Sequence, residues 1–305
     1  MRPLAFLLAL LAASGCGAVE RQLVEAAIAD RRDDAGLVAT ETVVDGRTVA
    51  FLEREGDGPT LVLVHGFGAS KDAWLAFAAE IPDGPRILVP DLAGHGDTEA
   101  GPGGYDALRL GDELGAWLDA AAPGPVHVAG SSMGGNVAAR LALDRPEAVR
   151  SLTLYDPAGV VPPVPSRRDS LAAAGDFVLI PTTRDAFDRL IALSFVEEPD
   201  IPGPARDVLA EDYARREPFL RSLLAGLGRD PDNVRPRLGE IAAPTLLVWG
   251  AEDHVIHVSA ASVWEAGLPD VTVQILPNVG HAPMMERPAE TAADFLSFVR
   301  QHDSP

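Results

Sequence analysis

The sequence predicts an α/β fold: a mostly parallel, eight-stranded sheet with helices on both faces. Strand-length apolar runs alternate with helix-length segments along most of the chain, which is typical of a sheet with right-handed crossovers. Runs such as 61–64 have no polar alternation, as expected of strands covered on both faces. Two runs of alternating apolar and polar residues flank Asp45-Gly46 and predict an antiparallel hairpin before these parallel strands.

Length, composition and net charge limit the kinds of protein that this chain can be. The 305 residues suffice for one large α/β domain, and 47% apolar and 23% charged residues are ordinary for a globular protein. The net charge of −20 argues against nucleic acid as a partner and weakens the binding of anionic substrates.

Residues 1–15 have the pattern of an export signal. A basic start, Met1-Arg2, precedes an apolar run too short to span a membrane, and small residues follow up to Cys16. This end resembles a bacterial lipoprotein signal, which implies cleavage before Cys16 and lipidation of that cysteine. It departs from the family at position 13, where Ala13 replaces the usual leucine. We expect an exported protein, lipid-anchored to the bacterial cell envelope. The alternative is an ordinary secretory signal and a soluble periplasmic or secreted protein.

A linker, eight strands and the helices between them are predicted after residue 15. Residues 16–37 form a linker with a surface helix, because apolar residues recur there at helical spacing. The predicted strands are 38–44, 47–52, 61–64, 86–90, 126–130, 151–155, 245–249 and 271–276. Helices are expected after Ser70, at 108–118, after Ser132, at 259–266 and at 288–300.

The alternation of strands and helices breaks at residues 160–237. Prolines 162, 163 and 165 come first, followed by helix-like pieces at 183–196, 205–216 and 217–228. We interpret this stretch as a helical insertion, a lid over the carboxyl edge of a core formed by 38–159 and 238–302. Ordinary surface helices are the alternative.

The motif G-x-S-x-G occurs at Gly130, Ser132 and Gly134, between a strand and a helix. In that context it is typical of a nucleophile elbow, a sharp turn that exposes the serine above the sheet. The alternative is a tight turn with a structural serine.

Ser132, Asp253 and His281 each follow a predicted strand at the sheet edge where ligands gather. A serine hydroxyl needs a base, and His281 is the candidate, with Asp253 orienting the imidazole. The backbone N–H groups of Phe67 and Met133 are the candidate oxyanion hole. Asp156, after the strand at 151–155, is the rival acid.

The other histidines fit structural roles better. His127 lies within a strand, His65 and His95 flank glycine turns, and His254, His257 and His302 fit caps or the surface. No paired ligand spacing predicts a metal site, and no motif predicts a cofactor.

From about residue 38 to 300 the chain resembles a lipase or esterase of the α/β-hydrolase superfamily. The motifs that carry the resemblance are His65-Gly66-Phe67-Gly68, Pro90-Asp91 with Gly94-His95-Gly96, Gly130 to Gly135, Val248-Trp249-Gly250 with Asp253, and Gly280-His281. The elbow, Asp156-Pro157-Ala158-Gly159 and Met285-Glu286-Arg287-Pro288 are similar to the monoacylglycerol lipase-like branch and to bacterial lipases near it.

This resemblance implies a serine carboxylester hydrolase that uses an acyl-enzyme on small neutral lipids: monoacylglycerols and short- to medium-chain esters. Members of that branch are often attached to membranes at the N-terminus. A C–C bond hydrolase, a cofactor-free perhydrolase and a non-catalytic binding module are the alternatives. Dehalogenases are excluded because they need aspartate where this chain has Ser132.

Overall fold

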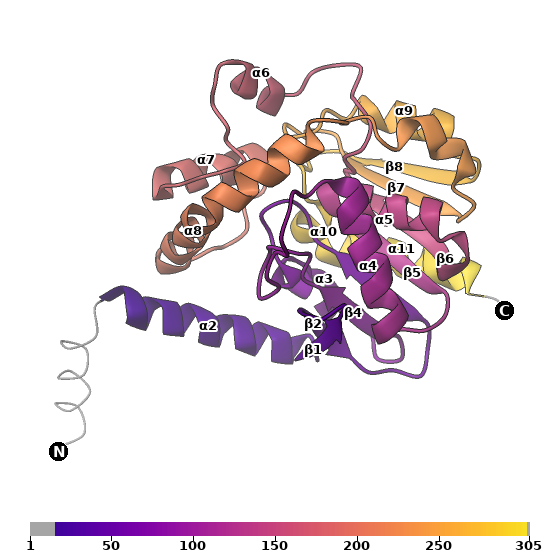
Figure 1. The fold of residues 1–305 in the computed structure, drawn as a ribbon, viewed down its shortest axis with the longest axis horizontal. Coiled ribbons are helices and arrows are strands. Elements are labelled where there is room, and N and C mark those ends of the chain that lie inside the picture. Colours follow the sequence, from indigo (N-terminus) through magenta and orange to yellow (C-terminus); the bar gives the residue numbers. More distant parts are fainter. Residues whose placement is uncertain (1–15, 304–305) are drawn as a thin grey trace.

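The computed structural model describes residues 16–303 and has one eight-stranded sheet (Figure 1). The strand order is β1-β2-β4-β3-β5-β6-β7-β8, with β1 and β2 antiparallel and the other six strands parallel to one another. The strands are β1 (Val38–Val44), β2 (Arg47–Arg54), β3 (Thr60–Val64), β4 (Arg86–Pro90), β5 (Val126–Ser131), β6 (Val149–Tyr155), β7 (Thr245–Gly250) and β8 (Val271–Leu276). The predicted fold class is confirmed.

The hairpin of β1 and β2 turns where the sequence predicts. Asp45 and Gly46 both have positive φ angles, 49° and 75°, which suit a two-residue turn between right-twisted strands. Val44 pairs with Arg47 directly across this turn.

The sheet separates two apolar layers because alternate strand residues face opposite sides. Val62 and Val64 contribute to a core with α4 (Ala107–Ala121), α5 (Met133–Asp144) and α9 (Ala260–Gly267). Leu61 and Leu63 contribute to the opposite core with α3 (Leu75–Ala79), α10 (Pro283–Glu286) and α11 (Pro288–His302). Short 3₁₀ turns lie at Lys71–Trp74, Pro146–Ala148 and Arg235–Glu240.

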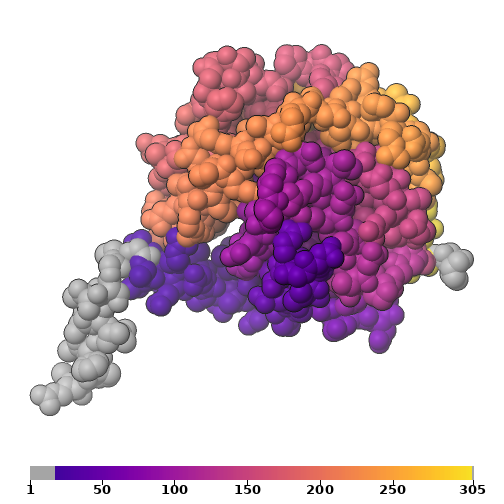
Figure 2. Space-filling view, in the orientation of Figure 1, coloured from indigo at the N-terminus to yellow at the C-terminus, as the bar shows by residue number. Residues whose placement is uncertain are grey.

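The segment between β6 and β7 holds α6 (Arg167–Ala173), α7 (Arg184–Ser194) and α8 (Gly203–Leu227). Figure 1 shows these helices grouped at one side of the sheet, and Figure 2 shows α8 running across that part of the surface. The two helix pieces expected at 205–216 and 217–228 are one continuous helix, with Pro218 inside it. Whether this segment moves as a lid stays a prediction.

The helix α2 (Cys16–Asp34) precedes the sheet, within the predicted linker at 16–37, and ion pairs join it to the body. Arg32 binds both carboxylate oxygens of Asp72 at 2.7 Å, and Arg21 contacts Glu211 and Asp212 on α8. Within residues 16–303 no helix combines the length and apolar character that crossing a membrane requires. The predicted export signal, 1–15, lies outside the described residues.

Candidate active site

The elbow at residues 130–134 is a tight turn between β5 and α5. Ser132 has φ 55° and ψ −119°, a conformation that non-glycine residues rarely adopt. A Cβ atom at Gly134 would overlap the carbonyl oxygen of Val64, and one at Gly130 would overlap Gly134. The glycines of the motif therefore let β5, α5 and the neighbouring strand approach closely enough to form the turn.

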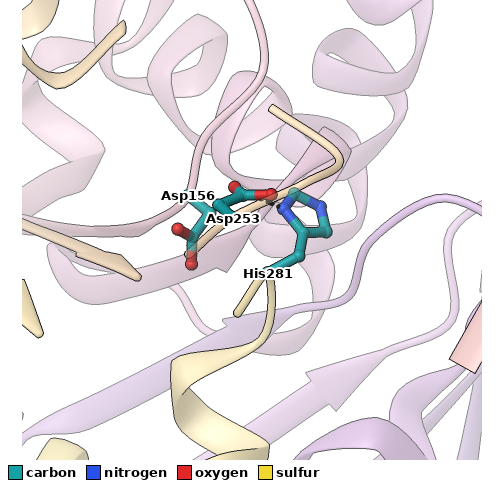
Figure 3. A group of neighbouring side chains, drawn as sticks. All are labelled: Asp156, Asp253 and His281. Atoms are coloured by element: carbon teal, nitrogen blue, oxygen red, sulfur yellow. Dashed lines mark hydrogen bonds and ion pairs between the residues drawn. The ribbon is translucent and has the colours of Figure 1, made fainter. Parts of the chain in front are cut away.

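A chain of hydrogen bonds joins the three predicted residues. The Ser132 Oγ lies 2.9 Å from Nε2 of His281, and Nδ1 of His281 lies 2.8 Å from Oδ2 of Asp253 (Figure 3). The Asp253 Oδ1 accepts the N–H groups of Val255 and Ile256 at 2.7 and 2.9 Å. With Nδ1–H donating to the carboxylate, Nε2 is the nitrogen that can accept the serine proton.

The loop that carries His281 is fixed from two sides. The His281 N–H donates to the carbonyl of Ser194, the last residue of α7, at 2.7 Å. Glu286 accepts the N–H of Gly280 at 2.7 Å with one carboxylate oxygen and the N–H groups of Val196 and Glu197 with the other. Glu286 thus ties the histidine loop to the segment after α7, a role that the sequence analysis missed.

Residues 65–68, here called the oxyanion loop because Phe67 is a candidate oxyanion-hole residue, pass beside the serine. A Cβ at Gly66 would lie 3.3 Å from Cβ of Ser132. Among residues 16–303, neither the N–H of Phe67 nor that of Met133 has a hydrogen-bond acceptor. Neither donor is therefore bound to another acceptor of the described chain, as an oxyanion hole requires.

Two neutral histidines hold the oxyanion loop in place. The Nε2 of His65 accepts the N–H of Leu92 at 3.0 Å, and Nε2 of His95 accepts the N–H of Gly68 at 3.1 Å. In each ring Nδ1 donates to a carbonyl, that of Gly66 or Ala93. Burial lowers the pKa of both His65 and His95, so they serve as hydrogen-bonded supports.

The helix α8 contacts the same loop. Arg216 donates from Nη2 to the carbonyl oxygen of Gly68 at 2.8 Å, and a Cβ at Gly68 would lie 2.6 Å from the ring of Tyr213. No hydrophobic pattern marks Arg216, because its role depends on a partner 148 positions away in the chain. No local pattern in the sequence therefore predicts this contact.

The rival acid, Asp156, lies within the same cluster (Figure 3). It follows β6 directly, is fully buried and accepts the N–H of Gly250 at 2.9 Å. The ring N–H of His281, however, donates to Asp253.

The three residues Asp156, Asp253 and His281 also form the one group of three potential metal-ligating side chains found among residues 16–303. Both oxygens of Asp253 already accept N–H groups, Oδ1 from Val255 and Ile256 and Oδ2 from Nδ1 of His281. This arrangement suits a hydrogen-bonded acid–base pair better than a cation site.

The remaining histidines lie apart from this cluster. His127 is buried in β5, 2.7 Å from the hydroxyl of Ser151, and His257 accepts the N–H of Ser259 at 3.1 Å. His254 is exposed, and His302 packs against Phe298.

The chain is similar to known proteins over most of its length. The family model described as "Alpha/beta hydrolase family" matches residues 61–294. The monoacylglycerol lipase abhd6-B of Xenopus laevis is 30% identical over 266 residues, which are 82% of this chain and 79% of that protein.

Two solved structures are similar over nearly their whole length. The crystal structure of a membrane phospholipase A, described as a bacterial virulence factor, is 34% identical with a TM-score of 0.92 and full coverage of both chains. A putative lipase from Acinetobacter baumannii AYE is 26% identical with a TM-score of 0.86, covering 91% of this chain and 96% of that one.

Proposed function

Because the chain belongs to the alpha/beta hydrolase family, we propose that it is a serine carboxylester hydrolase. The observation that carries this proposal is the hydrogen-bond chain from Ser132 through His281 to Asp253, built on a strained elbow. The lipases among the similar proteins support it.

The reaction follows from the positions of these atoms. The Nε2 of His281 takes the proton of Ser132 while Oγ attacks the ester carbonyl, and the resulting imidazolium is stabilised by Asp253. The N–H groups of Phe67 and Met133 stabilise the oxyanion, and each such donor contributes about 2.7–4 kcal/mol to the transition state. His281 returns the proton to the leaving alcohol, and water then releases the acid from the acyl-enzyme by the reverse sequence.

The substrates we propose are monoacylglycerols and short- to medium-chain esters, with Cys16 as the site of lipid attachment. The resemblance of the sequence to the monoacylglycerol lipase-like branch and the relative of that name support the substrate class. An anchor of two or three acyl chains would hold the protein firmly, because each buried CH₂ adds about 0.8 kcal/mol.

Hydrolysis of a p-nitrophenyl ester series and of a monoacylglycerol by the chain without residues 1–15 tests the activity. We expect turnover by this chain and a loss of about 10⁴- to 10⁶-fold in Ser132→Ala, because the nucleophile is removed. The control is Ser131→Ala, which removes a neighbouring hydroxyl and keeps the activity. The proposal fails if no ester is cleaved and a fluorophosphonate probe does not label Ser132.

The anchor has a separate test in bacterial cells that express the full chain. We expect the protein in the membrane fraction and Cys16→Ala in the soluble fraction. A membrane-bound Cys16→Ala variant would contradict lipidation at this cysteine.

A further inference from the structure

A second buried carboxyl group lies beside the proposed triad and has no part in the mechanism described above. One carboxylate oxygen of Asp156, one of Asp253 and one ring nitrogen of His281 all lie within 4.8 Å of one another. Asp156 is 0% exposed and Asp253 is 3% exposed, so water screens neither group. Two negative charges in such a site repel strongly, and one proton shared with the pair removes the repulsion.

The hydrogen bonds decide which aspartate holds that proton. Asp253 accepts two backbone N–H groups and the ring N–H of His281, all of which favour its ionised form. Asp156 accepts only the N–H of Gly250, and its Oδ2 is buried without a hydrogen-bond partner among the described residues. The proton therefore belongs on Asp156.

The charges around Asp156 favour the same assignment. Burial first, and then the negative charge of Asp253, raise the pKa of Asp156 well above its usual range, and Glu286 adds to the effect. His281 is the titratable group that could oppose this effect, and its Nδ1 already donates to Asp253.

We propose that Asp156 is a reserve acid of this site. It is a neutral carboxylic acid while Asp253 is ionised, and it becomes the ionised partner of His281 when the charge of Asp253 is removed. Removing that charge also removes the repulsion that, together with burial, keeps Asp156 protonated. An ionised Asp156 would then stabilise the His281 imidazolium, because its carboxylate already lies within 4.8 Å of a ring nitrogen. The inference rests on the proposed function.

Four chains test the inference: wild type, Asp156→Asn, Asp253→Asn and the double variant. Asparagine at 156 keeps an oxygen for the N–H of Gly250 and, like the neutral acid, carries a donor. We expect Asp156→Asn to stay within about threefold of wild-type kcat. Loss of a triad aspartate can cost about 10⁴-fold, and we expect only about 10²-fold in Asp253→Asn because Asp156 takes over. The double variant should reach the full loss.

The matched control is Glu252→Gln combined with Asp253→Asn. Glu252 neighbours Asp253 in sequence and accepts the N–H of Val279, which glutamine can also accept. This double variant should equal Asp253→Asn alone. Equal activities of Asp253→Asn and Asp156→Asn/Asp253→Asn would overturn the inference, as would a loss of about 10²-fold or more in folded Asp156→Asn.

Infrared difference spectra give a readout that does not depend on ester hydrolysis or on the folding of Asp156→Asn. At neutral pH the wild type should show the carbonyl band of a protonated carboxylic acid, and Asp253→Asn should lack it. A band that persists in Asp253→Asn overturns the reserve role. If no chain cleaves esters, the proposed function fails, whereas the spectra still report where the proton lies.

Discussion

At the scale of single residues, Lys71 shows how this acidic chain uses its only lysine. The side chain is 2% exposed, and Nζ lies 2.6 Å from Asp91 and 2.6 Å from Asp97. Burial alone would lower the pKa of Lys71, but the two carboxylates outweigh it and raise that pKa. The Lys71 N–H also donates to Asp91 at 2.7 Å, so the ion pair holds the chain that follows the oxyanion loop.

Lys71→Met should therefore destabilise the fold. Removing one partner leaves Asp91 buried without its counter-charge, and such a loss costs about 3–5 kcal/mol. Urea unfolding followed by circular dichroism measures the change. Arg184→Gln, which breaks exposed ion pairs with Asp188 and Asp207, is the control and should hardly move the midpoint. Equal urea midpoints for the two variants would contradict the prediction that the buried ion pair contributes more to stability than the exposed ones.

The proton on Asp156 predicts a pH-dependent stability. The folded chain keeps this proton above the ordinary aspartate pKa of 3.8, where the unfolded chain has lost it. The free energy of unfolding of the wild type therefore falls as pH rises from 3.8 towards the raised pKa, by at most about 1.4 kcal/mol per pH unit. Asp156→Asn has no such proton and should gain stability relative to wild type across this window. Urea unfolding at pH 4, 5, 6 and 7 measures the difference, and a constant difference would contradict the prediction.

At the scale of elements, the periodicity of the sequence predicted the sheet because strands and hairpins leave local signals. Residues 61–64 are apolar throughout because both faces of β3 are covered, and Asp45-Gly46 supplies the positive φ angles of its turn. The helix α8 was predicted as two pieces, 205–216 and 217–228, although proline disfavours a helix interior only locally. In the structure Pro218 lies within one helix that packs against α2 and α7, and such tertiary packing can override helix propensity.

The contact between α8 and the oxyanion loop predicts an effect on catalysis. Arg216→Met removes the hydrogen bond to the carbonyl of Gly68, next to the proposed donor Phe67. We expect kcat to fall about tenfold, which corresponds to about 1.4 kcal/mol of transition-state stabilisation, while KM changes little. Arg215→Met is the control, because Arg215 is exposed and pairs with Asp212. A rise in KM alone would instead assign Arg216 to substrate binding.

At the scale of the whole molecule, the candidate site could be predicted from the sequence because of the topology of the parallel sheet. Ser132, Asp253 and His281 follow β5, β7 and β8, whose carboxyl ends lie at one edge of the sheet. Topology could not separate Asp253 from Asp156, because β6 and β7 are neighbours and both aspartates follow a strand end. The choice depends on hydrogen bonds at atomic distances, which no local pattern encodes. The supports from Arg216 and Glu286 escaped prediction for the same reason.

The net charge of −20 gives the last prediction, which concerns lipid surfaces. An acidic protein is repelled by an anionic surface, and the Debye length is about 30 Å at 0.01 M salt but about 3 Å at 1 M. The chain without residues 1–15 should therefore hydrolyse a monoacylglycerol about three- to tenfold faster in zwitterionic vesicles than in vesicles with anionic lipid at low salt. High salt should remove the difference. A soluble p-nitrophenyl ester, which needs no surface, is the control and should show no such salt dependence. Faster hydrolysis on the anionic vesicles would mean that a local basic contact outweighs the charge of the whole molecule.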